Sequence, residues 1–384
     1  MIMAWTFGVA SIALLIWVYL GVLRGGFWQV RLPLAAAAPS VWPSVVAVVP
    51  ARDEADVIAQ SLGTLLTQDY PGTFHVMLVD DHSSDGTGAT AAAAAAKLGR
   101  TDRLTIVAAR DLPPGWAGKV WAQSEGLASA KAQFPQAEYF FLTDADIGHA
   151  TTTVQRLVAR AQAEQRVLTS LMVRLRCESF AERMLIPAFV FFFAKLYPFA
   201  QVNDIRSKVA AAAGGCMLAR ADALERIGGI AAIKDALIDD CALAAKMKQQ
   251  GSIRLDLAQD SYSLRRYEDA ASIWNMIART AFTQLGYSPL LLAGTVLGMA
   301  LTYLAPPVLT LTCGWAAWPA ILAWLLMMAM YCPMLRYYRQ PLWWTALLPL
   351  TALFYLAATL ASAWRYWRGR GGQWKGRAQA TPKR

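Results

Sequence analysis

The sequence contains few of the residues that build disulfide frameworks or metal clusters. Its 384 residues include only five cysteines and three histidines. The cysteines are scattered, without a CxxC pair, at Cys177, Cys216, Cys241, Cys313 and Cys332. This spacing supports neither a zinc site nor a set of disulfides. We interpret Cys216 and Cys241, in segments of predicted helix or core, as small hydrophobic residues, and this cysteine usage fits a reducing cytosol.

Glycine-rich phosphate-binding loops are also absent from the places where a nucleotide-binding sheet would carry them. The polar segments that follow the predicted strands contain neither GxGxxG nor GxxxxGK[ST]. Both patterns use glycines to bring backbone amides close to phosphates. Their absence argues against a dinucleotide-binding fold and against a P-loop.

The sequence is instead rich in apolar residues. They make up 56% of the chain, give a mean hydropathy of +0.34 and accompany a net charge of +10. This composition is typical of a membrane protein. The excess is concentrated at about residues 4–23 and 290–363, and the region between them has the pattern of one globular domain.

The first apolar run predicts a transmembrane anchor over residues 1–25. A run of about 20 residues matches a bilayer crossing and exceeds the apolar part of a signal peptide. Arg24 and Arg31 follow it, so the positive-inside rule places the globular domain in the cytoplasm. A signal cleaved near the alanines at 35–38 is the alternative. We expect a multi-pass protein of a bacterial-type inner (plasma) membrane.

The carboxyl-terminal region, residues 286–364, contains two or three hydrophobic segments that could cross a membrane. They are residues 288–305, 315–331 and 342–363. Three crossings would place the basic tail, residues 365–384, outside the cell, against the charge rule. This conflict leaves open a re-entrant or interfacial segment. Residues 184–202 are apolar but interrupted by prolines, which predicts a membrane-interface helix or, alternatively, a buried core helix.

The region 40–285 alternates strand and helix patterns. Apolar strand runs without interruption alternate with helical patterns, which predicts an α/β domain with a Rossmann-like, mainly parallel sheet covered on both faces. The predicted strands are residues 44–50, 75–81, 104–109 and 139–144, and the predicted helices are residues 54–67, 85–99 and 119–134. The alanines at 91–96 indicate a helix packed closely on the sheet, with a low-complexity linker as the alternative.

Acidic residues follow three of these strands, where ligands of such sheets bind. The polar sets are residues 50–54, 80–87 and 143–146. In extended chain, Asp144 and Asp146 fall on the same face and can converge on one divalent cation. Hard oxygen ligands suit Mg²⁺ or Mn²⁺ carrying a diphosphate. Taken singly, each set could equally be a solvated turn or a helix-capping loop.

Three motifs resemble those of glycosyltransferase family 2, whose members have the GT-A fold and use nucleotide-activated sugars. They are Val-Val-Pro-Ala-Arg-Asp-Glu at 48–54, Leu-Val-Asp-Asp-His-Ser-Ser-Asp-Gly-Thr at 78–87 and Thr-Asp-Ala-Asp at 143–146. Gly118-Lys119 followed by Ala122 resembles the family's Gly-Lys element. The resemblance covers about residues 44–285. With apolar segments at both ends, the chain looks most like the hopanoid-biosynthesis-associated membrane glycosyltransferases.

This resemblance implies a role for each matching residue. It places Asp146 and Asp144 at the metal, Asp240 as the catalytic base beside Asp239, and Gly214 and Gly215 in the acceptor region. The residues implied for nucleotide-sugar binding are Pro50, Arg52, Glu54, Asp80, Asp81, Lys119, Asp144 and Arg279. Simpler interpretations remain open. Arg52 and Lys119 could be plain surface charges, and the acidic pair could supply favourable charge at a helix terminus. The two glycines could form a tight turn, and Arg279 could belong to an ion pair on a helix surface.

The resemblance further implies an inverting enzyme that transfers one sugar from a nucleotide-diphosphate sugar to a lipid acceptor. A hopanoid is the acceptor that the resemblance suggests. No nucleic-acid partner is expected. Processive members carry Gln-x-x-Arg-Trp, whereas residues 274–280 here keep an arginine without the glutamine or the tryptophan at that spacing. This departure argues against polymer synthesis. A processive synthase and a non-catalytic membrane scaffold that keeps the fold are the alternatives.

Overall fold

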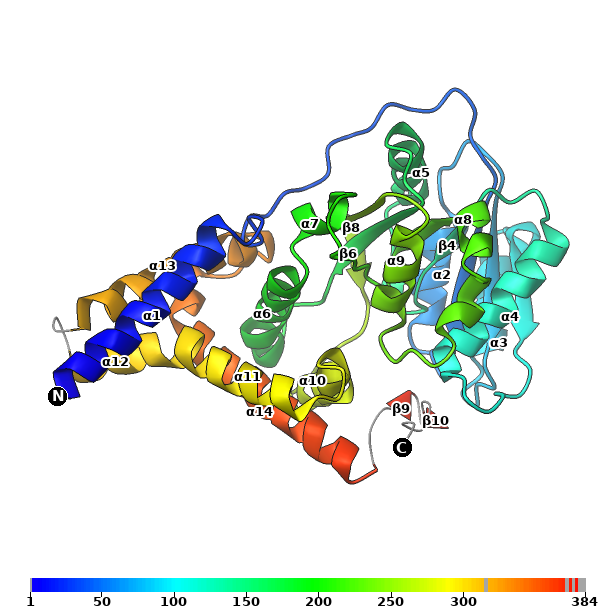
Figure 1. Cartoon of the computed structure of the whole chain (residues 1–384). Helices are drawn as coiled ribbons and strands as arrows, with labels where there is room; N and C mark the ends of the chain where they lie inside the picture. The colour runs from blue at the N-terminus through cyan, green and yellow to red at the C-terminus, as the bar shows by residue number, and fades with distance from the viewer. Residues whose placement is uncertain (1, 314–316, 370–372, 375–376, 379–384) are drawn as a thin grey trace. The chain divides into compact units, whose positions relative to one another are not determined.

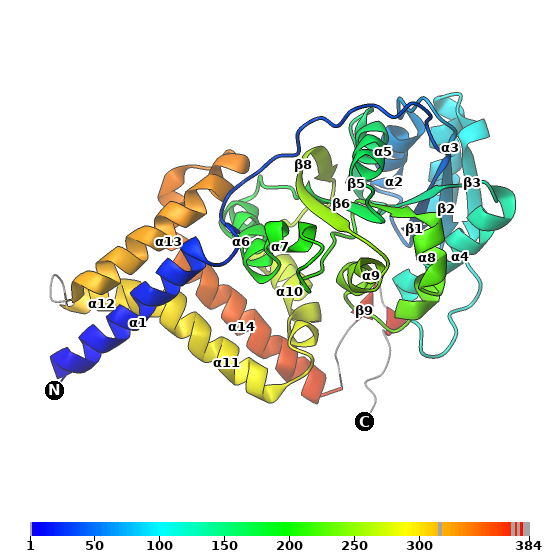
Figure 2. The same cartoon turned by 45° about the horizontal axis from the view of Figure 1, so that its top comes forward.

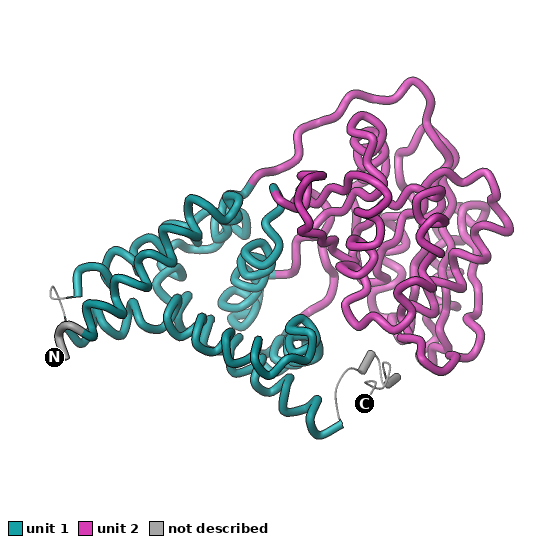
Figure 3. Tube along the Cα trace, in the orientation of Figure 1, with its two compact units in different colours: residues 1–30, 177–200, 267–371 teal, residues 31–176, 201–266, 372–384 magenta. Residues whose placement is uncertain are grey.

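The computed structural model describes residues 2–313, 317–369, 373–374 and 377–378, and the side chains of residues 5–313 and 317–369. The chain divides into two compact units, shown in Figure 3. The helical unit comprises Met1–Val30, Cys177–Ala200 and Tyr267–Gly371. The sheet unit comprises Arg31–Arg176, Gln201–Arg266 and Gly372–Arg384.

Among the described residues, eight strands of the sheet unit form one mixed sheet in the order β3-β2-β1-β4-β7-β6-β8-β5 (Figure 1). The first four strands in this order run parallel to one another, and β7 is antiparallel to both β4 and β6. Beyond them β8 is parallel to β6, and β5 is antiparallel to β8. The strands are β1 Val45–Ala51, β2 Phe74–Asp80, β3 Leu104–Ala108, β4 Tyr139–Leu142, β5 Ile147–Gly148, β6 Leu168–Arg174, β7 Met217–Arg220 and β8 Ile253–Ser263.

Helices connect these strands and cover the sheet (Figure 2). They are α2 Ile58–Leu66, α3 Thr87–Lys97, η1 Thr101–Arg103, α4 Gly118–Gln133, α5 Thr153–Ala163, α8 Ala221–Arg226, η2 Gly229–Ile233 and α9 Asp239–Lys248. The helix α7 Phe199–Asn203 straddles the boundary between the units, and the short strands β9 Gln373–Trp374 and β10 Arg377–Ala378 pair antiparallel near the end of the chain.

The prediction of an α/β domain with a mostly parallel sheet is confirmed. Each of the four predicted strands lies within two residues of its observed bounds. The predicted helix over 54–67 begins only at Ile58, because residues 55–57 form turns. The alanine run lies in α3, where Ala91 and Ala95 are buried, as close packing on the sheet requires.

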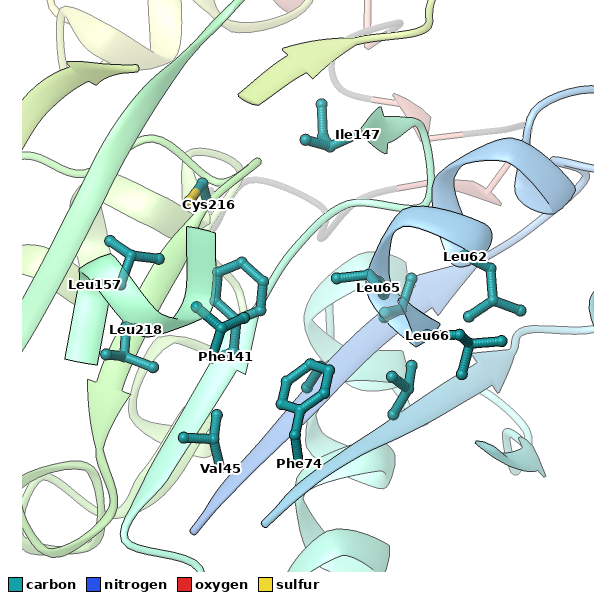
Figure 4. Close-up of a cluster of buried hydrophobic side chains, with 14 of the residues drawn as sticks. Val45, Leu62, Leu65, Leu66, Phe74, Phe141, Ile147, Leu157, Cys216 and Leu218 are labelled. Atoms are coloured by element: carbon teal, nitrogen blue, oxygen red, sulfur yellow. The ribbon is translucent and has the colours of Figure 1, made fainter. Parts of the chain in front are cut away.

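The core of the sheet unit lies between β1, β2 and β4 and the helix α2 (Figure 4). Every residue of β1 is buried, because both faces of this central strand are covered. From α2, Ile58, Leu62 and Leu65 follow helical spacing and turn one apolar face to the core. At Gly126 of α4, a Cβ would lie 2.6 Å from side chains of Val48 and Val79, so only glycine lets α4 pack this closely.

Among its described residues, the helical unit contains four helical stretches that are long and apolar enough to cross a membrane: Trp5–Val22, Pro289–Cys313, Trp318–Tyr337 and Leu342–Trp367. Its elements are α1 Ile2–Val22, α6 Phe180–Leu196, α10 Ala270–Gln284, α11 Pro289–Met299, the π-helical turn η3 Ala300–Leu304, α12 Ala305–Cys313, α13 Trp318–Tyr337, η5 Leu342–Leu347 and α14 Leu348–Trp367. The predicted segment 288–305 is therefore part of a longer stretch that continues to Cys313. Trp315 and most of the basic tail lie outside the described residues.

The predicted helix over 184–202 is two helices, α6 and α7, separated at Pro198. The amino terminus of α6 has a capping box, in which Ser179 accepts from the Glu182 backbone and the Glu182 side chain accepts from Ser179. Aromatic rings of α6 contact the neighbouring helices α13 and α14, with Phe191 5.1 Å from Tyr331 and Phe192 5.1 Å from Tyr355 between ring centroids. Within the helical unit α6 therefore has the packing of a core helix, and its place at a membrane interface stays a prediction.

The division into units differs from the predicted domain over 40–285. Residues 177–200 and 267–285, which carry α6 and α10, group with the helical unit. Both helices bury apolar faces against α14, and this packing explains the grouping.

We predict that Phe141→Ala destabilises the sheet unit by about 3–5 kcal/mol, the usual cost of emptying a fully buried aromatic site. Phe141 is completely buried in the core of β4. Urea unfolding of the detergent-solubilised protein, followed by the fluorescence of Trp121 in a variant that keeps few other tryptophans, measures the change. Exposed Leu98→Ala is the control. A loss below about 1 kcal/mol would show that the core is placed wrongly.

Candidate active site

The loops that follow β1 and β2 are tied to each other. Asp53, which has a positive φ of 50°, accepts a hydrogen bond from the backbone of Ser84 at 2.8 Å. The guanidinium of Arg52 donates to the carbonyls of Asp81 and His82. These contacts fix the two loops as one surface at the carboxyl ends of the strands.

The two neighbouring aspartates at the end of β2 have different surroundings. Asp80 accepts a hydrogen bond from the backbone N–H of Ser83 at 2.9 Å. The side chain of Asp81 is fully buried, with one carboxylate oxygen 3.9 Å from the Arg52 guanidinium. Arg52 is therefore bound to the loop and is not the plain surface charge of the alternative reading.

An open pocket of about 580 Å³ lies beside these loops, at the ends of β2 and β3. It is lined by His82, Ala109, Arg110, Asp111, Pro113 and Trp121. The Trp121 indole N–H donates to the Arg110 carbonyl at 2.8 Å. The Arg110 side chain is held by Glu125 through bonds of 2.7 and 2.8 Å. The pocket thus combines an aromatic face with a positioned guanidinium, a combination that suits a planar heterocycle.

Lys119 joins the acidic strand end to the acidic helix start. Its ammonium lies 2.7 Å from Asp144 and 3.2 Å from Asp239. Only 15% of the Lys119 side chain is exposed. Burial works against the charged amine, but the carboxylates of Asp144, Asp239 and Asp240 outweigh it, and the pKa of Lys119 is raised. Lys119 is consequently a permanent cation at the centre of the site.

Arg265 is a second cation of the site, and the sequence reasoning missed it. It donates to Asp146 at 2.6 Å and to Glu54 at 2.9 Å. Strand β5 pairs with β8, and the Leu264 N–H donates to the Asp146 carbonyl, which brings Arg265 beside that carboxylate. The pair Arg265-Arg266 directly after a long strand is the signal that could have revealed it.

Asp240 is held at the start of α9 by two backbone groups. Its carboxylate accepts from the N–H of Gly214 at 2.9 Å and of Cys241 at 2.7 Å. Burial and the neighbouring Asp239 raise its pKa to about 6, against the opposing effect of Lys119 and the two hydrogen bonds. A carboxylate with this pKa can accept a proton near neutral pH.

Gly214, in the loop before β7, lies beside the charged cluster formed by Lys119, Asp144, Asp239 and Asp240. A Cβ at this position would lie 3.1 Å from the Lys119 ammonium and 3.6 Å from Asp240. At Gly215 a Cβ would be 3.2 Å from the side chains of Ile147 and Val173. Both glycines therefore serve close packing, beyond the tight turn of the alternative reading.

A buried hydrogen-bond chain joins this loop to the strand end that carries the aspartates. The Thr143 hydroxyl donates to the Gly215 carbonyl at 2.8 Å and lies 2.9 Å from His149 Nε2. Because that hydroxyl has given its proton to the carbonyl, we assign the His149 proton to Nε2, so that Nδ1 accepts from Ser261 at 3.0 Å. Burial lowers the pKa of His149 to about 3, so it stays neutral. Neither His149 nor Ser261 belongs to a motif that the sequence reasoning used.

Pro50, Glu54 and Arg279 lie outside the group of residues that Lys119 joins. Pro50 is a buried residue of β1, paired with Val79 of β2. Glu54 contributes its carboxylate to Arg265, and its backbone N–H donates to Thr87. Arg279 is an exposed residue of α10, in the helical unit and not in the unit that holds the cluster. Its predicted contact with the donor diphosphate stays a prediction.

The sequence model of glycosyl transferase family 21 matches residues 5–378. The chain belongs to this family. The prediction of a glycosyltransferase is therefore confirmed, with family 21 matched where the motifs resembled family 2. A search of curated protein sequences finds no significant match.

Solved structures of glycosyltransferases share the fold. The mannosyltransferase PcManGT from Pyrobaculum calidifontis, in complex with GDP-Man and Mn²⁺, has a TM-score of 0.57 at 18% identity, covering 95% of this chain and 98% of that one. This likeness over both whole chains supports the GT-A-like fold. S. aureus TarS 1–349 with UDP-GlcNAc has a TM-score of 0.41 at 14% identity, covering 87% and 95%, which is too low to add to the argument.

We predict that Lys119→Met destabilises the sheet unit by about 2–3 kcal/mol at pH 8, because it leaves buried carboxylates without their shared cation. The loss should shrink at pH 5. Asp240 already has a raised pKa, removal of Lys119 raises it further, and its protonation below about pH 6 removes one negative charge. Urea unfolding at both pH values measures this, with exposed Lys131→Met on the same helix as the control. Equal losses at pH 5 and pH 8 would contradict the assigned charge cluster.

Proposed function

We propose that this protein is a membrane-bound, inverting glycosyltransferase that moves one sugar from a nucleotide-diphosphate sugar to a lipid acceptor. One observation carries the proposal. Lys119 joins Asp144, at the end of the central strand β4, to the acidic pair Asp239 and Asp240 at the start of α9. Groups suited to a donor diphosphate and a group suited to proton removal thus belong to a single cluster.

The donor's nucleoside fits the end of β2 and the pocket beside it. Asp80, which is partly exposed at the end of β2, supplies acceptors for base or ribose donors, and Arg110, whose guanidinium lies over the Trp121 ring, lines the pocket. Arg52 adds positive charge from the adjacent loop. The complex of the similar mannosyltransferase with GDP-Man supports a nucleotide sugar as the donor class.

The carboxylates suit a divalent cation that arrives with the donor. Asp144 and Asp146 offer hard oxygens, and a single oxygen of each is bound by Lys119 or Arg265. No group of three or more His, Cys, Asp or Glu side chains among the described residues could hold a metal alone. The two carboxylates would supply the protein ligands of Mg²⁺ or Mn²⁺, and diphosphate oxygens of the donor would supply further ligands. When bound there, the cation would neutralise charge that develops on the leaving diphosphate.

Asp240 is the proposed catalytic base. Its carboxylate accepts the proton of the acceptor hydroxyl while that oxygen forms a bond to the anomeric carbon of the sugar. The bond from this carbon to the diphosphate oxygen breaks on the opposite face, so the configuration inverts. Lys119 forms an ion pair with Asp239 beside the base and offers positive charge toward the diphosphate. Gly214 and Cys241 orient the carboxylate of the base.

The apolar helices support the proposed lipid acceptor and membrane location. In the described part of the helical unit, four stretches are long and apolar enough to cross a bilayer. An enzyme resident in a membrane meets its acceptor there, and a hopanoid is the candidate that the sequence resemblance suggests. The absence of the glutamine and tryptophan of processive enzymes around Arg279 favours the transfer of a single sugar. We place the sheet unit in the cytoplasm, where nucleotide sugars are made.

The purified protein in nanodiscs of a bacterial lipid extract, given Mn²⁺ and a panel of radiolabelled UDP- and GDP-sugars, should label one lipid product. Activity should rise with pH about an apparent pKa near 6, because Asp240 must lose its proton before it can act. Asp240→Asn should abolish transfer while keeping the thermal midpoint of the wild type. Transfer by this variant, or no labelled lipid with any donor, would contradict the proposal.

Asp146→Ala should remove the Mn²⁺-dependent binding of UDP or GDP, since a hard-cation site with two carboxylates loses half of its protein ligands. Asp146 lies in the loop after β4 with its side chain 12% exposed, so the thermal midpoint of Asp146→Ala shows whether the truncation unfolds the sheet unit. Isothermal titration calorimetry of each nucleotide with and without Mn²⁺ measures the effect. Exposed Asp102→Ala is the matched control. Unchanged Mn²⁺-dependent binding in Asp146→Ala would overturn the metal assignment.

A further inference from the structure

The two cations of the active site are anchored differently. Lys119 projects from the first turn of α4 with 15% of its side chain exposed. Arg265 lies in a segment without regular structure, residues 264–268, directly after β8. Its side chain is 37% exposed, whereas those of its partners Asp146 and Glu54 are 12% and 10% exposed. Arg265 can therefore swing away without opening a cavity, and the carboxylates cannot.

The position of Arg265 coincides with that of the proposed metal. Its Nε donates to Asp146, the carboxylate that the metal-dependent donor site requires. Its terminal nitrogen is bound separately to Glu54. A divalent cation and a guanidinium compete for the same negative charge, so bringing the cation to Asp146 weakens the hold on Arg265. The bond to Glu54 then keeps Arg265 at the edge of the site.

We propose that Arg265 is an exchangeable placeholder, that is, a cation that occupies the metal's position beside Asp146 until the donor binds. Without donor it neutralises Asp146 and keeps the affinity for free metal low. When the metal–donor complex arrives, Arg265 leaves Asp146, pivots on Glu54 and binds the diphosphate of the donor, for which a guanidinium fork is well suited. The site therefore favours metal with nucleotide over metal alone. This inference rests on the proposed function and adds to it an ordered use of the two cations.

The test compares the binding of Mn²⁺ alone with the binding of nucleotide at saturating Mn²⁺. Free Mn²⁺ is measured by electron paramagnetic resonance, and UDP and GDP by calorimetry. Arg265→Gln should bind Mn²⁺ alone about five- to thirtyfold more tightly, the effect of removing an ion pair from the metal's carboxylate. It should bind the nucleotide about tenfold more weakly, because the diphosphate loses a charged hydrogen bond.

Two further variants separate this role from general charge and from packing. Arg266→Gln removes the same charge from the exposed neighbouring position and should change neither affinity more than about twofold. Arg265→Lys keeps the charge but not the fork that reaches both carboxylates, so it should also bind Mn²⁺ alone more tightly than the wild type. Thermal midpoints show whether each variant is folded.

Equal Mn²⁺ affinities in the wild type, Arg265→Gln and Arg265→Lys would overturn the placeholder, and so would equal effects of Arg265→Gln and Arg266→Gln. If Mn²⁺ alone is too weak to measure in the wild type, its appearance in Arg265→Gln supports the proposal, and its absence from both Arg265 variants overturns it. The proposed function is tested separately by Asp146→Ala. If metal-dependent nucleotide binding persists in that variant, the proposed function fails.

Discussion

The active site depends on the electrostatic balance around one buried ammonium. Lys119 contacts Asp144 and Asp239, and its charge also lowers the pKa of Asp240. Three carboxylates in one partly buried site would repel one another strongly without it. Gly214 has to be small because the ammonium passes beside its Cα. The separate loops after β4, before β7 and before α9 are therefore constrained by a single charge on α4.

The directions of the strands in the sheet bring these charged residues together. The parallel strands β1, β2 and β4 end together, which collects the acidic loops at one edge. The antiparallel strand β7 then leads the chain past β4, so that Gly214 and Gly215, just before it, lie next to the loop after β4. Mixed strand direction is what brings Gly214 and Gly215 next to the acidic loop after β4. A wholly parallel sheet would have placed the start of β7 at the other edge.

The sequence predicted the strands and the acidic strand ends well, because uninterrupted valine and leucine runs followed by aspartates are a strong local pattern. It also predicted the partners of the cluster, Lys119, Asp144, Asp239, Asp240 and Gly214, through the motifs that carry them. It missed Arg265 and His149, since their roles depend on the pairing of the two-residue strand β5 with β8 across more than one hundred positions. The late start of α2 was missed for a similar reason, because the backbone N–H groups of Glu54 and Ala55 donate to the side chains of Thr87 and Asp85 in the segment after β2. Arg279 keeps only the arginine of the Gln-x-x-Arg-Trp motif, and it lies on a helix of the helical unit.

Neither unit is a continuous piece of the chain. The polypeptide passes between the helical and the sheet units after Val30, Arg176, Ala200 and Arg266. The insertion Cys177–Ala200 carries α6, whose rings contact helices encoded more than one hundred residues later. Removing residues from either end therefore cannot yield an isolated sheet unit, since α6 would remain within it with its apolar surface uncovered. During synthesis α6 must wait for α13 and α14, so the helical unit is complete only after the last apolar helix has been made.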